Sequence, residues 1–353
     1  MTIRRIACQK EHVMTHKINF MNDYNTVAHP EIVEALKSAI DEKHEGYGLD
    51  ERSETARKMI REMTECPQAD VQFLPTGTLA NLTSIASFLR PHEAVIAQAA
   101  AHINIHETGA IEAVGHKILT IETHSGKLCP ADIPPIIAQQ VDEHMVKPKM
   151  LYISQTTEKG TVYTTEELSE LRKLCDEEGL VLYIDGARLS YALVSDAAVP
   201  DLKTIAKLCD AFYIGGAKCG ILFGEALVVT NPKLQDDLRY LIKQRGGLVG
   251  KGFLMGIQFE ALLRDRLDLK MAGHANELAR KLTSGLAGKG VSFDIETESN
   301  QVFPIVTHKK DKELEEKVIY EKWRDLDEKD CVIRFCTSWA TTDQEVDELL
   351  KMF

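Results

Sequence analysis

The chain has 353 residues, 44% of them hydrophobic, and its 42 Lys and Arg stand against 54 Asp and Glu, a net charge of -12. This length accommodates a large domain and a smaller one, each with its own core. The acidic balance argues against a nucleic-acid surface or a basic membrane-binding face, so we expect no nucleic-acid and no membrane partner, and a small-molecule substrate.

Residues 1–17 are polar and poorly patterned, and they are predicted to form an arm outside the fold that can be disordered. They lack the apolar segment of a secretion signal, and the chain has no apolar stretch long enough to span a membrane. The eight cysteines show no Cys-x-x-Cys spacing, which favours reduced thiols. These features together predict a cytoplasmic protein.

The first chemical signal along the chain is a Gly-Thr step at the start of a helical pattern. A short apolar segment precedes Thr76, Gly77 and Thr78, and the helical pattern covers residues 79–89. Free backbone N–H groups, the helix dipole and the threonine hydroxyls would together bind a phosphate there. A threonine-capped helix after a strand has the same pattern, so this segment alone leaves both interpretations open.

Strand-like and helical segments then alternate. The runs 94–97, 149–153 and 180–184 are apolar, and a helical pattern such as 166–178 stands between them. This alternation predicts an α/β fold with a mainly parallel sheet wrapped by helices.

Asp185 directly follows the run from Leu180 to Ile184, which is continuously apolar, as expected of a strand buried on both faces. Asp185 is therefore predicted to lie at the carboxyl end of a strand, the edge of an open α/β sheet where ligands bind. A carboxylate there can pair with a protonated pyridine nitrogen and keep the ring an electron sink.

Lys218 follows the next strand candidate, residues 211–214, in the sequence Gly215-Gly216-Ala217-Lys218. The glycines allow a tight turn and a close approach of the backbone to a flat ligand. A lysine among apolar groups has a depressed pKa, which favours the neutral amine that attacks an aldehyde. A lone lysine in such a sequence is far more often a surface residue in a turn. With Asp185 before it, the pair predicts pyridoxal phosphate, bound to Lys218 as a Schiff base.

From about residue 232 the pattern changes, and we predict a large cofactor-binding domain over 18–235 and a small α+β domain over 236–353. The expected elements of this region are helices over 233–245, 251–282 and 342–352, and short strands over 291–295 and 302–306.

Arg334 is a charge inside the apolar run that begins at Val332, where an unpaired guanidinium would be costly. Its partner is either a substrate carboxylate or an internal Asp or Glu.

Taken with these residues, the chain resembles the threonine aldolase and β-eliminating lyase family of fold-type I pyridoxal phosphate enzymes, from about residue 19 to the end. The resemblance implies a seven-stranded, mainly parallel sheet and a homodimer or homotetramer with active sites at the dimer interface. The matching segments, in order, are Asn22-Asp23, His29-Pro30-Glu31, Gly46-Tyr47-Gly48, Thr76 to Asn81, Ala101 to Asn104, Glu107-Thr108-Gly109, Gln155 to Tyr163, Asp185 to Leu189 and Gly215 to Lys218.

The resemblance also implies site roles. His102 would stack on the pyridine ring and lie near the substrate β-carbon, and Glu107 would orient it or hold a water at the substrate, unless Glu107 is a plain helix residue. Arg188 would contact the substrate carboxylate or the phenolic oxygen of the cofactor. The basic, glycine-rich stretch ending at Lys251 would reach a phosphate, of its own or of a neighbouring subunit, or it is only a helix break. Asn22 stands where the family has a substrate-binding serine.

The implied reaction is retro-aldol cleavage of a β-hydroxy-α-amino acid such as L-threonine or L-allo-threonine to glycine and an aldehyde. His102 and His144 are both candidates for the base, although His144 also fits a solvated loop residue. The lysine motif departs from the usual family pattern, because Ala217 and Cys219 replace threonine and asparagine. The substrate side chain and its stereochemistry therefore stay open.

Two other functions remain as alternatives. One is β-elimination or another pyridoxal phosphate reaction of amino acids on the same scaffold, since the orientation of the broken bond decides between them. The other is a non-catalytic α/β protein that binds a nucleotide phosphate at Gly77, although neither common nucleotide-binding glycine motif is present. No metal is predicted, because His102 and His106 lack a convincing third ligand.

Overall fold

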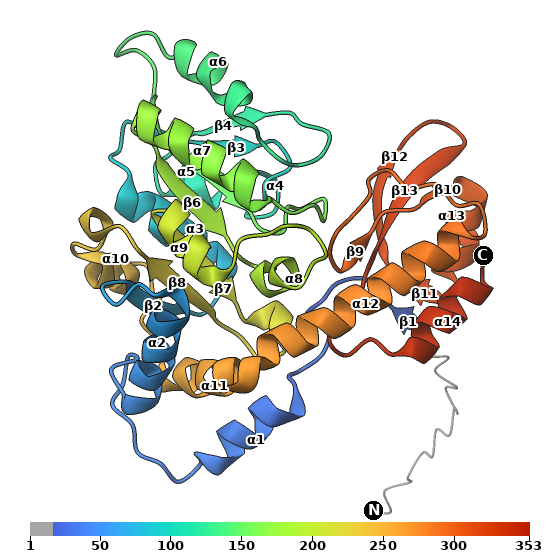
Figure 1. Cartoon of the computed structure of the whole chain (residues 1–353), viewed down its shortest axis with the longest axis horizontal. Coiled ribbons are helices and arrows are strands. Elements are labelled where there is room, and N and C mark those ends of the chain that lie inside the picture. The colour runs from blue at the N-terminus through green and yellow to red at the C-terminus, as the bar shows by residue number, and fades with distance from the viewer. Residues whose placement is uncertain (1–16) are drawn as a thin grey trace, which may run out of the picture.

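The computed structural model describes residues 17–353, so the predicted arm over 1–17 lies almost entirely outside the described residues. Figure 1 shows a large domain built on a central sheet and a smaller domain at the carboxyl end, joined by the long helix α12. Within the described residues, none of the helices combines the length and apolar character needed to cross a bilayer.

The central sheet has seven strands in the order β2-β8-β7-β6-β5-β3-β4. Only β8 is antiparallel to its neighbours, which confirms the mainly parallel sheet. The strands are β2 (Asp70–Leu74), β3 (Glu93–Gln98), β4 (Ile118–Ile121), β5 (Lys147–Ser154), β6 (Val181–Asp185), β7 (Ala211–Gly215) and β8 (Glu225–Val229).

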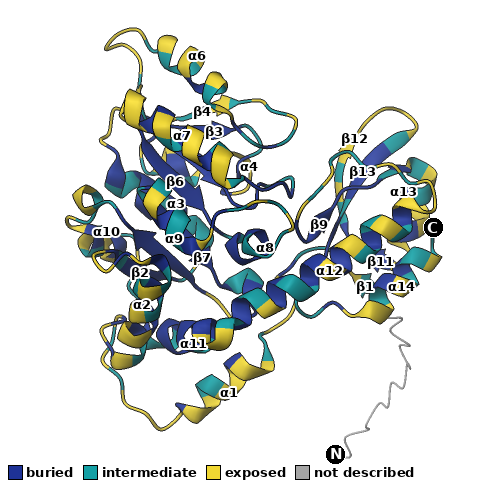
Figure 2. Cartoon of the chain, in the orientation of Figure 1, coloured by how far each residue is buried: buried dark blue, intermediate teal, exposed yellow. Residues whose placement is uncertain are grey.

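Helices cover both faces of this sheet, and buried strands lie between them (Figure 2). The helices of the large domain are α1 (Pro30–Ser38), α2 (Glu51–Thr64), α3 (Gly77–Phe88), α4 (His102–Ile105), α5 (Ala110–Ala113), α6 (Ile133–Ala138), α7 (Thr165–Glu178), α8 (Leu189–Leu193), α9 (Leu202–Leu208), α10 (Leu238–Gln244) and α11 (Phe253–Leu263). Short 3-10 turns lie at Pro130–Asp132, Ala217–Cys219, Pro232–Leu234 and Arg264–Arg266.

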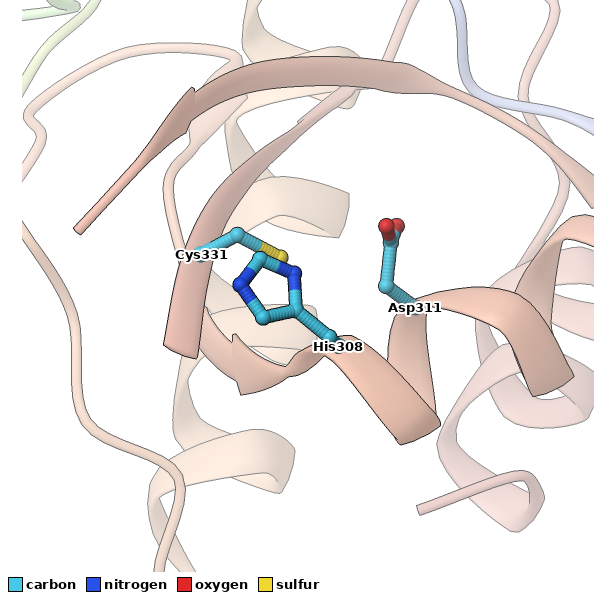
Figure 3. A group of neighbouring side chains, drawn as sticks. All are labelled: His308, Asp311 and Cys331. Carbon is cyan, nitrogen blue, oxygen red and sulfur yellow. The ribbon is translucent and has the colours of Figure 1, made fainter. Parts of the chain in front are cut away.

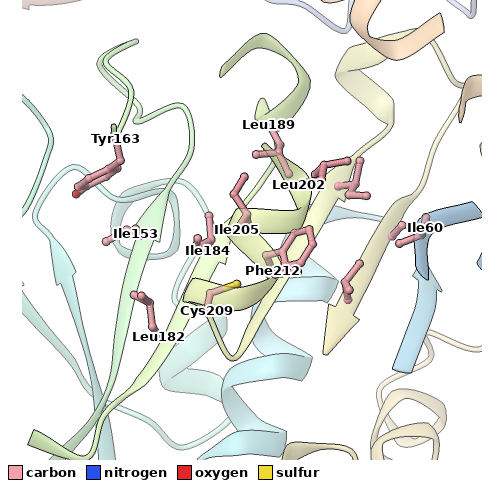
Figure 4. Close-up of a cluster of buried hydrophobic side chains, with 14 of the residues drawn as sticks. Ile60, Ile153, Tyr163, Leu182, Ile184, Leu189, Leu202, Ile205, Cys209 and Phe212 are labelled. Carbon is pink, nitrogen blue, oxygen red and sulfur yellow. The ribbon is translucent and has the colours of Figure 1, made fainter. Parts of the chain in front are cut away.

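Alternating side chains of each strand pack into two different cores. Leu182 and Ile184 of β6 point to one face, where Ile205 of α9 and Cys209, just after α9, pack against them (Figure 4). Tyr183, between them, faces the other core, which α3 and α10 cover. A strand buried on both faces must be apolar throughout, and this explains the continuous apolar runs of the sequence.

The small domain pairs β10 (Ile305–Thr307), β13 (Asp330–Cys336) and β12 (Glu321–Asp325) in an antiparallel sheet, and β9 (Gln301–Val302) adds to β13. Helices α12 (Leu267–Ala287), α13 (His308–Glu315) and α14 (Asp343–Lys351) pack around it. The strand β1 (Ile18–Asn19) pairs with β11 (Val318–Ile319), so the start of the described chain belongs to the small domain. The predicted strand over 291–295 is wrong, because only Phe293 forms a bridge there.

The predicted domain boundary at residue 235 is also wrong. Helix α10 packs on α3, and α11 packs on α1 and α2, so both helices belong to the large domain. The long helix expected over 251–282 is broken at Asp265 and Arg266, which have left-handed φ angles of 54° and 53°. The first half of α12 contributes to a core of the large domain and its second half to the core of the small domain. The boundary therefore lies within α12.

Gly186 lies where two strand ends meet, and only a glycine fits. A Cβ atom there would lie 1.7 Å from the carbonyl oxygen of Tyr213 on β7. We expect Gly186→Ala to destabilise the fold by about 3 kcal/mol or more, since backbone would have to move. Urea unfolding measures this. Gly273→Ala on α12 is the control, because its Cβ would meet open space, and a loss of stability equal to that of Gly186→Ala would contradict the account.

Candidate functional site

A cavity of about 390 Å³ opens at the carboxyl edge of the central sheet, between the two domains. The parallel strands and the helix starts that follow them deliver most of its lining, and the small domain closes one side. The lining residues are Tyr24, Thr76, Gly77, Thr78, His102, His106, Ser154, Thr156, Glu158, Asp185, Ala187, Arg188, Tyr213, Lys218, Glu225, Glu321, Trp323 and Arg334.

Asp185 ends β6 as a buried carboxylate surrounded by donors. Its Oδ2 accepts hydrogen bonds from the hydroxyl of Tyr152 at 2.5 Å and from Nδ2 of Asn81 at 2.9 Å. Its Oδ1 accepts from the Tyr213 hydroxyl and from the Ala187 backbone N–H at 3.0 Å. Burial opposes the charge, but His102 and these donors outweigh it and lower the pKa of Asp185 below its ordinary value. The site therefore presents a fixed negative charge.

Lys218 follows β7 in the 3-10 turn, and its side chain lines the cavity. Its Nζ has no hydrogen-bond partner within residues 17–353. Burial and the nearby Arg188 guanidinium lower the pKa of Lys218, although three carboxylates act in the opposite direction. The glycines before it are required by packing: a Cβ on Gly215 would lie 2.3 Å from the Ala187 carbonyl oxygen. This is the setting of a nucleophilic amine.

The first turn of α3 forms one end of the cavity. The Thr76 hydroxyl caps the helix by accepting from Leu79 N at 3.1 Å. The backbone N–H groups of Gly77 and Thr78 are not used by the helix, and together with the helix dipole they suit an anionic group. The sequence was consistent with either a threonine cap or a phosphate site at this helix start. The structure shows the threonine cap and places the helix start at the same cavity as Lys218.

His102 begins α4 and forms one wall of the cavity. Its Nδ1 lies 2.8 Å from Oε1 of Glu107, a buried carboxylate. The same Oε1 accepts from Nδ2 of Asn81 at 2.8 Å, and Asn81 also donates to Asp185. Glu107 therefore orients His102, as one sequence interpretation had it. Because Glu107 is not among the lining residues, the prediction that it contacts substrate is not supported.

Arg188 forms a buried ion pair with Asp23. Its Nε and Nη2 donate to the two carboxylate oxygens of Asp23, at 2.7 and 3.0 Å, so its planar fork is already occupied. Asn300 also donates to Asp23 at 3.0 Å. Burial works against the Asp23 charge, but Arg188 and Lys218 lower its pKa to about 2. Arg188 lines the cavity as predicted, and in this structure its Nε and Nη2 are engaged by Asp23, so its contact with a substrate carboxylate or with the cofactor stays a prediction.

Arg334 lies on β13 with its guanidinium at the mouth of the cavity. It donates from Nη1 to Oε1 of Gln301 at 3.1 Å and from Nη2 to the Met21 carbonyl at 3.3 Å, and Nη2 forms an ion pair with Glu321. Its Cζ lies 5.5 Å from the centre of the Trp323 ring. The internal carboxylate that the sequence offered as one alternative thus exists, yet the arginine also faces the ligand space.

Three predicted site residues lie outside the cavity of their own chain. His144 is exposed and precedes β5, whose other end, Ser154, lines the cavity. A strand of this length spans about 23 Å at about 3.3 Å per residue, so His144 cannot be the base in its own subunit. Lys251 is exposed beyond the lining residues. Asn22 accepts from Tyr24 N at 3.1 Å and does not line the cavity.

The carboxyls of Glu158, Glu225 and Glu321 line the cavity, and the sequence analysis gave none of them a role. Oε1 of Glu158 accepts from the His102 N–H at 2.9 Å and from the Ser154 hydroxyl at 2.7 Å, and burial raises the pKa of Glu158. Oε2 of Glu225 accepts from Gly216 N at 2.9 Å, and burial raises the pKa of Glu225 to about 8. The local sequence around these glutamates did not indicate a role at the site. They reach the cavity because the strands beside them are paired in the folded sheet.

A separate cluster in the small domain joins His308, Asp311 and Cys331, with donor atoms within 4.8 Å of one another (Figure 3). Asp311 already accepts from the Tyr320 hydroxyl at 2.6 Å, and burial raises the pKa of Cys331 to about 11. These atoms are engaged within the protein and the thiol resists ionisation, so we assign the cluster no metal. The prediction that the protein uses no metal stays a prediction.

The arrangement fits pyridoxal phosphate. Lys218 offers an unpartnered amine, Asp185 a fixed anion for a pyridine nitrogen, the start of α3 an anion site, and His102 an aromatic wall. These four groups come from four segments of the chain and face one space of suitable size for a cofactor with an amino acid.

Comparison with known proteins agrees with this geometry. A profile of the beta-eliminating lyase family matches residues 19–309. The low specificity L-threonine aldolase of a Pseudomonas species is 34% identical over 287 residues, covering 80% of this chain and 83% of that protein. The enzyme of the same name from Pseudomonas aeruginosa is 34% identical over 291 residues, covering 82% and 84%.

Solved structures extend the likeness to the whole fold. Leishmania major threonine aldolase superimposes with a TM-score of 0.93 at 44% identity, covering 95% of this chain and 98% of that one. Thermus thermophilus aspartate aminotransferase, at 15% identity and a TM-score of 0.72, covers 96% and 91% and shares the fold alone. The fold is therefore that of the fold-type I pyridoxal phosphate enzymes, as predicted, and the chain belongs to the beta-eliminating lyase family.

Proposed function

We propose that this protein uses pyridoxal phosphate to cleave a β-hydroxy-α-amino acid of the threonine type into glycine and an aldehyde. The observation that carries the proposal is the convergence of Lys218, Asp185 and the first turn of α3 on one cavity. The names of the relatives, threonine aldolases over most of the chain, support the substrate class.

When bound, the cofactor supplies an electron sink for the electron pair released at Cα. Lys218 holds it through its amine, and Asp185 stays ionised to pair with its ring nitrogen. The N–H groups of Gly77 and Thr78 receive its phosphate. Arg334 at the cavity mouth binds the substrate α-carboxylate, because its guanidinium is the cation on that side.

His102 is the proposed base for the β-hydroxyl proton. The buried Glu107 carboxylate accepts from Nδ1, which keeps the proton on that nitrogen and leaves Nε2 with a free lone pair. We choose His102 of the two predicted candidates because it lines the cavity, which His144 of the same chain does not.

Product identification tests the function. Incubation of the loaded enzyme with L-threonine or L-allo-threonine should release acetaldehyde and glycine in equal amounts. Ammonia with a 2-oxo acid, in place of glycine, would establish β-elimination instead. Release of neither set of products from any β-hydroxy amino acid would contradict the proposal.

Arg334→Gln should raise KM for L-threonine about tenfold to a hundredfold, because a charge-assisted hydrogen bond contributes about 1.5–3 kcal/mol. kcat should change much less, since the carboxylate is bound equally before and during bond cleavage. Steady-state kinetics with Arg324→Gln as the control checks this, because Arg324 lies outside the cavity lining. An unchanged KM would remove Arg334 from substrate binding.

We also propose a homodimer or homotetramer located in the cytoplasm. Large apolar side chains are exposed on the N-terminal segments of the large domain, among them Val27, Ile40 and Leu49, and such residues suit a contact with a second copy. The seven described cysteines are free thiols, which suits a reducing compartment. Light scattering of the purified protein tests the oligomer, and a monomer at working concentration would contradict it.

A further inference from the structure

Glu321 and Arg334 lie directly opposite each other on the paired strands β12 and β13, and both line the cavity. Their ion pair joins Oε2 of Glu321 to Nη2 of Arg334. A carboxylate is therefore held at the guanidinium that the small domain contributes to the cavity. Neither the relatives' names nor the proposed reaction accounts for it.

The hydrogen bonds of Arg334 limit how it can receive another carboxylate. A carboxylate binds a guanidinium in a planar fork through Nη1 and Nη2, or through Nε and Nη2, so both forks use Nη2. Two acceptors already lie at Nη2: the Met21 carbonyl, which accepts a hydrogen bond from it, and Oε2 of Glu321, which forms an ion pair with it. A substrate carboxylate can form either fork only after one of these acceptors leaves.

Glu321 is the acceptor that can leave. Its side chain is 32% exposed, so it can turn into solvent, whereas the Met21 carbonyl is backbone, with Met21 N donating to Asn19 Oδ1 at 3.0 Å. Without Glu321 the guanidinium would still be held by Gln301, by the Met21 carbonyl and by the face of Trp323. Nε of Arg334 is buried with no partner within the described residues, ready to complete a fork.

We propose that Glu321 is a resident counter-anion of Arg334 that the substrate carboxylate must displace, so that the site accepts ligands able to compete with it. The proposal rests on the function above, in which Arg334 binds that carboxylate. It makes Glu321 a specificity-determining residue: a carboxylate can take its place on Arg334, and a neutral group cannot.

Kinetics of Glu321→Gln test the proposal, because glutamine keeps the shape and removes the charge. We expect KM for L-threonine to fall about threefold to fivefold, the range of a partly exposed ion pair, with kcat within about twofold. Glu321→Asp should give a smaller decrease, since its shorter chain still carries the charge. Glu328→Gln, an exposed residue of the loop between β12 and β13, is the control and should leave KM unchanged. A KM that is unchanged or raised in Glu321→Gln overturns the proposal.

A binding measurement on the cofactor-free protein gives an independent readout. The chain has two tryptophans, so Trp339→Phe leaves the fluorescence of Trp323, which packs on Arg334. The Trp339→Phe protein is compared with the double variant that also carries Glu321→Gln, at constant ionic strength. Acetate should perturb the fluorescence of the double variant at a severalfold lower concentration. Acetamide should not perturb the fluorescence of either protein. Equal acetate responses in the two proteins would overturn the proposal.

The Arg334→Gln experiment separates the two possible failures. If Arg334→Gln raises KM but Glu321→Gln does not lower it, Arg334 binds the carboxylate without competition, and only this inference fails. If Arg334→Gln leaves KM unchanged, the proposed binding of the carboxylate by Arg334 fails, and this inference fails with it.

Discussion

Replacing Lys218 with alanine should reduce kcat by at least about ten-thousandfold, the scale of loss when a covalent nucleophile is removed. Its amine lines the cavity and has no hydrogen-bond partner within residues 17–353. The protein should stay folded, because the turn that carries Lys218 is held by backbone contacts such as the Tyr191 hydroxyl on the Lys218 carbonyl at 2.7 Å.

The measurement is single-turnover aldehyde release together with the visible absorption of the loaded protein. Lys173→Ala is the control, because Lys173 is exposed on α7, and it should keep both the activity and the absorption band. Aldehyde release by Lys218→Ala at more than about one hundredth of the normal rate would remove Lys218 from its role.

Asp185→Asn should reduce kcat about a hundredfold to a thousandfold, as expected when a fixed charge that stabilises a transition state is removed. The amide has nearly the same shape but carries no negative charge, and its NH2 group would meet donors such as Asn81. Because the pKa of Asp185 is lowered in the folded protein, the charge is complete above the ordinary carboxyl range. Its contribution to stability and activity is lost only as the pH falls through that lowered pKa.

Kinetics at neutral pH check this prediction, with Asp176→Asn as the control because Asp176 is an exposed residue of α7. The loss should persist between pH 6 and 9, where Asp185 is ionised throughout. A variant whose kcat stays within about twofold of the original protein would show that the charge of Asp185 is not needed for the reaction.

The sequence predicted the cofactor residues because each stands at a local signal. Asp185 ends a continuous apolar run, and Lys218 follows glycines that come after another such run. Parallel strands place both at the same edge of the sheet, so the local pattern sufficed to bring them together. The same rule could have excluded His144, which precedes its strand and so lies at the opposite edge.

The rest of the site depends on contacts between segments far apart in the chain. Asp23 binds Arg188 across 165 residues, and Asn81 donates to Asp185 across 104 residues and to Glu107 across 26. A carboxylate in the segment before α1, or an asparagine in a helix, has no local pattern that indicates its partner. The sequence therefore placed Arg188 at the site but did not indicate that Asp23 is its partner.

The domain boundary was missed for a related reason. Helix α11 is buried on nearly all sides against α1 and α2, and an apolar helix of this kind shows that it is buried without showing in which core. The change of pattern near residue 232 marked the end of the strands in the large domain and not the end of that domain.

Trapping the bound cofactor tests the central claim most directly. The purified protein is loaded with pyridoxal phosphate, reduced with borohydride and digested, and the labelled peptide is sequenced by mass spectrometry. We predict one label per chain, on Lys218, and its loss when L-threonine is added before reduction. A label on another lysine, or none, would contradict the assignment of this cavity as the cofactor site.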